Sequence, residues 1–181
     1  AMGLAPDMMT LAKGLTSGYV PMSAVMVGDR VAARLIADGG EFYHGFTYSG
    51  HPVASAVALA NLDLIEKLDL VTRVRDETGP YLASALARLA DHPIVGEVRS
   101  YGLLGAIELV KSKDGPTMFD EVGKAGALCR DHAIEHGMMM RAVRDGMIMS
   151  PPLTFTPQDI DKMIGITALA LDKTADDLGI S

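Results

Sequence analysis

The pattern of hydrophobic and polar positions divides the chain near residue 77. An apolar run over residues 21–28 predicts a buried strand, and residues 7–13 predict the approach to a short strand or turn. Apolar side chains then recur at spacings of three and four from Val53 to Leu68, which predicts a long helix. These elements are too few to enclose a core. Residues 1–77 therefore read as the last part of a larger α/β domain.

Helix starts in this region are predicted from residues that suit a first turn. Asp29 is placed to cap a short helix that runs to Ile36, and Ser49 is placed to cap the long helix, with Pro52 in its first turn. A further helical stretch covers about residues 70–89, and a Gly-Pro pair inside it predicts a kink or a break.

From residue 94 the pattern changes to strands alternating with helices. It predicts two strands, over residues 94–99 and 103–110, followed by a helix over residues 118–136. A hairpin of residues 138–143 and 147–150, turned at Asp145-Gly146, and a last helix from residue 156 onward complete the prediction. The methionines at 138–140 are assigned to a buried strand. Residues 78–181 therefore predict a small α+β domain with its own core.

Composition and charge then narrow the class of protein. Hydrophobic residues make up 49% of the 181 residues and the mean hydropathy is +0.22, which excludes an intrinsically disordered chain. The net charge of −7 argues against a nucleic-acid partner, which requires a basic surface. No apolar run reaches the roughly 18 residues of a membrane span. The single cysteine, Cys129, and a first segment unlike a signal peptide predict a cytoplasmic protein.

Lys13 is the first candidate for chemistry. It follows an apolar stretch and has Ala12 and Gly14 as neighbours, so another group could approach the backbone closely. A lysine held in a dry pocket becomes a nucleophile toward carbonyls, which is the chemistry of pyridoxal phosphate (PLP) enzymes. Taken alone, the residue is more simply explained as a solvated surface lysine.

The second candidate is the segment 46–52, which leads into the predicted long helix. A helix start offers unpaired N–H groups and a partial positive charge, and the hydroxyl of Thr47 adds a donor, so the segment could seat a phosphate. On spacing alone, plain helix capping is the simpler interpretation.

Together the two segments change the interpretation. Residues 7–19, with Lys13 at their centre, and residues 45–52, with Phe46 and Thr47, closely resemble the class III PLP-dependent aminotransferases, in particular the omega-amino acid or amine–pyruvate branch. The resemblance continues through residues 91–99, 102–104, 140–142 and 150–153 to the end of the chain.

The resemblance implies a fold and a set of roles. The fold would be α/β, that of PLP-dependent transferases of fold type I (aspartate-aminotransferase-like), with residues 1–77 ending the large domain and residues 78–181 forming the small C-terminal domain. Lys13 would form the Schiff base with PLP and move the proton during transfer. Thr47 would bind the PLP phosphate of the neighbouring subunit, with Phe46 beside it, so a homodimer or larger assembly is expected.

Arg141 matches the mobile arginine that the family uses to pair with the carboxylate of an amino or keto acid. Arginine suits this task because its planar fork donates two hydrogen bonds to a carboxylate. Arg144 departs from the family pattern, in which a small residue is more usual at that position. A second cation there would alter the preference for the acceptor, which is expected to be pyruvate.

The resemblance also implies that essential parts lie upstream of residue 1, including the acidic partner of the pyridine nitrogen and the aromatic residue that stacks on the ring. The chain alone is therefore expected to be inactive, as a fragment lacking the N-terminal half. Two alternatives stay open: a remnant that acts only as a folding or dimerisation module, and another class III reaction such as that of an aminomutase or decarboxylase.

One possible metal site is set aside at this stage. Cys129, His132 and His136 share a predicted helix at a spacing that would align three zinc ligands on one face. The chain offers no second cysteine pair, so a surface helix with scattered histidines is the preferred interpretation and no metal is expected.

Overall fold

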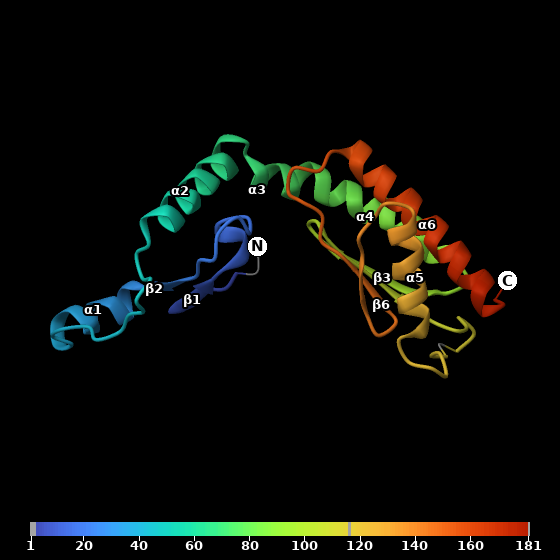
Figure 1. Ribbon diagram of the computed structural model, residues 1–181, viewed down its shortest axis with the longest axis horizontal. Coiled ribbons are helices and arrows are strands. Elements are labelled where there is room, and N and C mark those ends of the chain that lie inside the picture. The colour runs from blue at the N-terminus through green and yellow to red at the C-terminus, as the bar shows by residue number, and fades with distance from the viewer. Residues whose placement is uncertain (1–2, 116, 181) are drawn as a thin grey trace. The chain divides into compact units, whose positions relative to one another are not determined.

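The computed structural model describes residues 3–115 and 117–180 and divides the chain into two compact units (Figure 1). The N-terminal unit ends at Leu68 and the C-terminal unit begins at Asp69. This division comes earlier than the boundary near residue 77 expected from the sequence. The reason is that the helix over residues 79–87 packs against the sheet and the last helix of the C-terminal unit, and the helical turns over residues 70–78 lead directly into it.

The N-terminal unit contains a two-stranded ribbon and two helices. Its elements are β1 (Met8–Leu11), a 3₁₀ turn (Lys13–Leu15), β2 (Ala24–Val27), α1 (Asp29–Asp38) and α2 (Pro52–Lys67). β1 and β2 pair antiparallel, with Met8 opposite Val27. The prediction that residues 21–28 form a strand is confirmed for its second half. The prediction that this strand is buried is wrong for this chain, because Val25 and Met26 are each 54% exposed.

Both helices of this unit begin where the sequence predicts, but their N-cap residues differ from the predicted ones. Gly28 precedes α1, and Asp29 lies in its first turn without capping it. His51 caps α2 because its Nδ1 accepts a hydrogen bond from the N–H of Ala54 (3.5 Å). The predicted cap, Ser49, instead accepts from the N–H of Phe46. Pro52 is in the first turn of α2, as predicted.

The C-terminal unit contains a four-stranded antiparallel sheet and four helices. Its elements are α3 (Leu70–Arg73), a π-helical turn (Val74–Thr78), α4 (Gly79–Ala87), a 3₁₀ turn (Arg88–Asp91), β3 (Val95–Tyr101), β4 (Leu104–Leu109), α5 (Lys124–Glu135), β5 (Arg141–Val143), β6 (Gly146–Met149) and α6 (Pro157–Leu178). The strand order is β3-β4-β6-β5. The break expected at the Gly-Pro pair is the π-helical turn, directly before α4.

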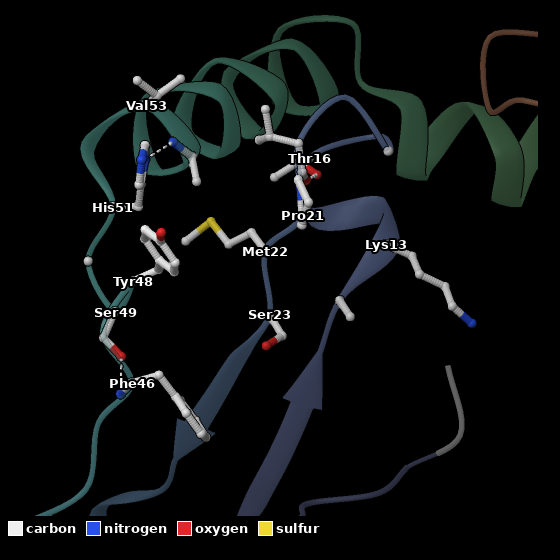
Figure 2. Close-up of a pocket in the computed structure, with 15 residues that line it drawn as sticks. Lys13, Thr16, Pro21, Met22, Ser23, Phe46, Tyr48, Ser49, His51 and Val53 are labelled. Atoms are coloured by element: carbon white, nitrogen blue, oxygen red, sulfur yellow. Dashed lines mark hydrogen bonds between the residues drawn. The ribbon is translucent and has the colours of Figure 1, made fainter.

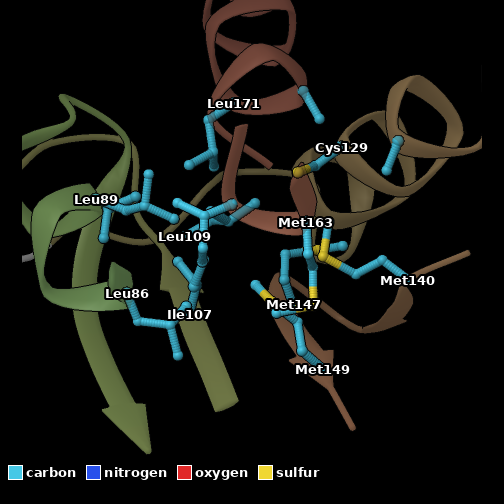
Figure 3. Close-up of a cluster of buried hydrophobic side chains, with 14 of the residues drawn as sticks. Leu86, Leu89, Ile107, Leu109, Cys129, Met140, Met147, Met149, Met163 and Leu171 are labelled. Atoms are coloured by element: carbon cyan, nitrogen blue, oxygen red, sulfur yellow. The ribbon is translucent and has the colours of Figure 1, made fainter. Parts of the chain in front are cut away.

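The core of this unit lies between one face of the sheet and the helices α4, α5 and α6 (Figure 3). Alternate residues of β4 point into it, so Ile107 and Leu109 are fully buried whereas Leu104 is 58% exposed. The buried side chains come from every layer and include Leu82, Leu86, Ile94, Val95, Cys129, Met147, Ile160 and Leu171. The sequence prediction of a small domain with its own core fits this packing.

A contact between distant residues decides where α5 begins. The buried carboxylate of Asp145 accepts hydrogen bonds from the N–H groups of Gly123 (2.8 Å) and Gly126 (3.1 Å), at the start of the helix. A side-chain oxygen bound to these unpaired N–H groups acts as a cap supplied from outside the helix. The helix therefore starts at Lys124, and the prediction of a start at residue 118 is wrong.

The hairpin of β5 and β6 is confirmed with a small shift of its turn. Val143 pairs with Gly146, so the loop is Arg144-Asp145, and Arg144 has a φ of +54°. The prediction of a buried strand over the methionines at 138–140 is wrong: these residues form a loop, and Met139 is 93% exposed.

The last helix is built as its sequence predicts. Thr156 and Asp159 form a reciprocal capping box, and Pro157 opens the helix. These hydrogen bonds hold the pKa of the Asp159 carboxyl below its usual value. No helix within the described ranges is both long and apolar enough to cross a membrane.

Candidate functional site

Lys13 lies in a tight turn that follows β1. Its φ is +52°, and Ser17 further along the same turn has a φ of +50°. Both values are unfavourable for residues other than glycine, asparagine and aspartate. The carbonyl of Lys13 accepts hydrogen bonds from the N–H groups of Thr16 and Gly18, each at 3.3 Å. Thr16 is buried and donates to the carbonyl of Val20 (2.6 Å), which closes the turn.

A single side chain of α2 binds this turn at three points. Nδ2 of Asn61 donates to the carbonyl oxygens of Gly14 (2.9 Å) and Leu15 (3.2 Å), and its Oδ1 accepts from the hydroxyl of Ser17 (2.6 Å). Asn61 is a functional candidate that the sequence analysis missed. The signal for it was present, since it is the only asparagine in the chain and stands inside an apolar helix, where asparagine is a poor helix former.

The segment before α2 forms a second tight turn. The N–H of Phe46 donates to the hydroxyl of Ser49 (2.9 Å), and the N–H of Ser49 donates to the carbonyl of Phe46 (2.9 Å). Thr47 lies inside this turn and is exposed. The first turn of α2 follows at once, and its Ala54 N–H is bound by the side chain of His51.

Lys13 and Phe46 both line a hollow of about 890 Å³ in the N-terminal unit, a volume within the range of ligand pockets. The other lining residues include Met22, Ser23, Tyr48 and His51, and Thr47 is not among them. Figure 2 shows the side chain of Lys13 directed away from Phe46 and Tyr48. Lys13 is exposed, so its amine is not in the dry pocket that its neighbours suggested.

Arg141 lies in the C-terminal unit, at the start of the edge strand β5 and opposite Ile148 of β6. It is exposed and lines a hollow of about 790 Å³ together with methionines 138–140, Phe155 and Lys162. Within the described ranges no carboxylate forms an ion pair with Arg141. A guanidinium that has no ion pair and lies beside apolar side chains can bind the carboxylate of a molecule with a short or apolar carbon chain.

The three residues considered as zinc ligands face different surroundings. Cys129 is fully buried, and burial raises the pKa of its thiol to about 11. His132 lies between two carboxylates, with Nε2 2.8 Å from Asp177 and Nδ1 3.3 Å from Glu135. Among the residues that the structure describes, no group of three or more His, Cys, Asp or Glu side chains is arranged so that it could hold a metal ion.

Comparisons with known proteins identify the family of the chain. Residues 1–171 match the family model described as aminotransferase class-III. Putrescine–pyruvate aminotransferase of Pseudomonas aeruginosa is 51% identical over 173 residues, which are 96% of this chain and 38% of that protein. Diaminobutyrate–2-oxoglutarate transaminase of Halomonas elongata is 41% identical over an alignment of 182 positions, which covers 97% of this chain and 39% of that protein.

Solved structures give the same result. The omega transaminase of Pseudomonas jessenii in complex with PMP superposes with a TM-score of 0.89 at 40% identity, over 98% of this chain and 40% of that one. A transaminase with L-Ala superposes with a TM-score of 0.90.

The chain therefore belongs to the class III aminotransferases and has the fold of PLP-dependent transferases of type I. It is similar to omega-transaminases and to the putrescine–pyruvate enzyme, and it spans about two fifths of the length of these relatives. The resemblance drawn from the Lys13 and Thr47 segments is confirmed at the level of the family.

Proposed function

We propose that the enzyme containing this chain transfers an amino group from an amine or omega-amino acid to a keto acid, with pyruvate as the acceptor. Membership of a PLP-dependent family supports amino transfer, and the similarity to a relative named for putrescine and pyruvate supports the substrates. The observation that carries the proposal is the exposed primary amine of Lys13, presented by a strained turn whose hydrogen bonds hold it in place.

The residues around Lys13 fit PLP by their chemistry. A cofactor aldehyde needs a primary amine with free space around it, and a Cβ added at Gly14 would meet no atom within 4 Å. When bound, PLP supplies an electron sink for the substrate carbon. Lys13 would hold the cofactor through its amine, and the same amine would carry the proton during amino transfer.

Thr47 and Phe46 are assigned to the phosphate of PLP in the neighbouring subunit of a homodimer. The exposed Thr47 hydroxyl next to the start of α2 suits a phosphate. The direction of the Lys13 side chain, away from Phe46 and Tyr48, supports the assignment of the two segments to different sites (Figure 2).

Arg141 is assigned to the carboxylate of the acceptor. It is exposed, and in the described part of the chain it has no acidic partner that would compete with a substrate. The lack of an ion pair leaves the guanidinium available for bidentate binding. Arg144 lies three positions further on, in the hairpin loop, and would add positive charge near the end of β5.

The remaining length of the enzyme is expected to complete the active site. In this proposal residues 1–77 are the last part of the PLP-binding large domain, and residues 78–181 are the small domain. The exposed apolar residues of β2 and α2 would be covered by the rest of the large domain, because a helix that is apolar on all sides is normally buried. The 181 residues alone would then be inactive.

The first test uses the full-length enzyme with PLP and borohydride, followed by mapping of the modified peptide. We expect one adduct, at Lys13, its loss in Lys13→Ala and no change in Lys67→Ala, since Lys67 is an exposed lysine of α2. Adducts spread over surface lysines would contradict the assignment. Product formed from a single amino acid, without alanine from pyruvate, would instead identify an aminomutase or decarboxylase.

The second test addresses Arg141. Arg141→Ala should raise the apparent KM for pyruvate by about 10- to 100-fold, the range for loss of a charge-assisted hydrogen bond. Arg130→Ala is a matched control, because Arg130 lines the same hollow but is already paired with Asp131. Equal pyruvate KM values in the wild type and Arg141→Ala would refute the role.

A further inference from the structure

We propose that Asn61 is a positioning residue for Lys13, in that its carboxamide holds the turn that presents the lysine amine. This inference rests on the proposed role of Lys13 in binding PLP. Asn61 touches neither the cofactor nor the substrate in this proposal, and it acts only through the backbone of the turn.

The three hydrogen bonds of Asn61 fix consecutive parts of the turn. Its Nδ2 donates to the carbonyl oxygens of Gly14 (2.9 Å) and Leu15 (3.2 Å). These are the two carbonyls that directly follow the carbonyl of Lys13 along the chain. The Lys13 carbonyl is itself bound by the N–H groups of Thr16 and Gly18. Three successive carbonyls are thereby oriented, and the direction of the Lys13 side chain at its Cα is determined with them.

The backbone angles show why such a clamp is needed. Lys13 and Ser17 both have positive φ values, which side chains with a Cβ rarely adopt. Residues in such conformations persist only where the surrounding structure over-determines them, and they gather at functional sites. The hydroxyl of Ser17 donates to Oδ1 of Asn61 (2.6 Å), so one side chain binds the turn near both strained residues.

Among side chains of this size, only the carboxamide of asparagine can make all three contacts. Asparagine has two N–H donors and a carbonyl acceptor, whereas aspartate has acceptors only and leucine has neither. An aspartate would also bring a negative charge against two carbonyl oxygens. The cost of placing asparagine in the middle of α2 is therefore matched by a specific use of its side chain.

Fixing the turn matters because lysine has a long and flexible stem. An amine that must reach both the cofactor and the substrate carbon gains from a fixed origin, since reacting groups that are held in place react far faster than free ones. A loosened turn should therefore slow the steps at Lys13 while leaving the binding of the keto acid unchanged.

The test uses the full-length enzyme and the variants Asn61→Leu, Asn61→Asp and Ser17→Ala. Asp63→Asn is the matched control, because residue 63 is two positions along α2 and so lies on the opposite side of the helix. The first readout is hydrogen exchange at the amides of residues 15–19 in the cofactor-free enzyme. The second is the rate at which PLP becomes trappable at Lys13 by borohydride, with thermal stability measured in parallel.

We expect Asn61→Leu and Asn61→Asp to speed amide exchange in the turn and to slow attachment at Lys13 by about tenfold, as for the loss of one or two net hydrogen bonds. Ser17→Ala removes one contact and should slow attachment by about two- to fivefold. In steady state, kcat should fall while the KM for pyruvate stays constant. Asp63→Asn should match the wild type in every readout.

Three outcomes would show that Asn61 does not have the proposed role or that the proposed function is wrong. Wild-type attachment rates in Asn61→Leu and Ser17→Ala would overturn the proposal. If stability falls but attachment and kcat per folded enzyme do not, Asn61 is a packing contact only, and the proposal is again wrong. If wild-type enzyme gives no adduct at Lys13, the proposed function itself fails, and amide exchange still shows whether Asn61 clamps the turn.

Discussion

The two units of the chain use similar apolar side chains in opposite ways. In the C-terminal unit Leu86 and Ile107 are fully buried between the sheet and the helices. In the N-terminal unit α2 exposes 64% of Leu59 and 53% of Leu64, and it buries only Ala54 and Ala58. The C-terminal unit therefore encloses a core of its own, whereas the apolar side chains of α2 in the N-terminal unit lie largely at the surface.

The comparison also separates the proposed chemistry. Lys13, Thr47 and Asn61 belong to the unit with the exposed apolar surfaces, and Arg141 belongs to the unit with the closed core. In the N-terminal unit, hydrogen bonds to backbone carbonyls hold the turn that carries Lys13.

The largest expected effect is on the free energy of unfolding, when a leucine is replaced by alanine in each of the two units. Leu86→Ala should lower the free energy of unfolding of the 181-residue chain by roughly 2–5 kcal/mol, because it leaves a cavity in a packed core. Leu59→Ala should change it by less than about 0.5 kcal/mol, because the side chain is already in water. Urea unfolding followed by circular dichroism measures both values.

Repeating the pair in the full-length enzyme sharpens the comparison. If the rest of the large domain covers α2, Leu59→Ala should there become costly, at roughly 2–5 kcal/mol. Equal and small effects of Leu59→Ala in both proteins would mean that α2 stays exposed in the enzyme.

Local sequence was sufficient wherever neighbours in the chain decide the structure. The start of α6 near residue 156 and the long helical pattern of α2 were predicted correctly, and the strands of the β5–β6 hairpin were found within a few residues. In each case the deciding contacts lie within four residues or across a two-residue loop.

Sequence reasoning failed where the deciding partner is distant or outside the pattern. Asp145, which caps α5, follows Gly123 by 22 residues, so the pattern near residue 123 could not predict where the helix starts. The burial of β2 was overestimated because burial depends on what covers a strand, which periodicity does not contain. The site residues Lys13, Phe46, Thr47 and Arg141 came from family motifs, and Asn61 was missed because a helical pattern records it only as a polar position.

The next effect concerns the thiol in the closed core. Burial raises the pKa of Cys129 from 9.0 to about 11, so at pH 8 the folded chain should react with iodoacetamide about a hundredfold more slowly than the chain in urea. A cysteine in the other unit, introduced as Leu59→Cys, should react at nearly the unfolded rate because that position is 64% exposed. Similar rates at the two cysteines would mean that the C-terminal core opens readily.

The same pKa shift predicts a pH dependence of stability. A folded-state pKa above the unfolded one favours folding while the thiol is protonated, so the stabilisation is complete below pH 9 and is lost as the pH rises toward 11. Cys129→Ala should remove this alkaline loss. A fall in stability of equal size and midpoint in Cys129→Ala would assign the loss to other groups.

The smallest effect tests backbone strain in the unit with the closed core. Arg144 has a φ of +54° in the two-residue hairpin loop, where glycine is favoured, so Arg144→Gly should stabilise the chain by about 1 kcal/mol. Arg130→Gly, inside α5, should have the opposite sign and a similar size, since glycine is unfavourable within a helix. Thermal unfolding of both variants gives the two signs directly. If Arg144→Gly destabilises the chain, the arginine side chain contributes more to the hairpin than its backbone strain costs. The departure from a small residue at this position would then be explained by folding rather than by acceptor preference.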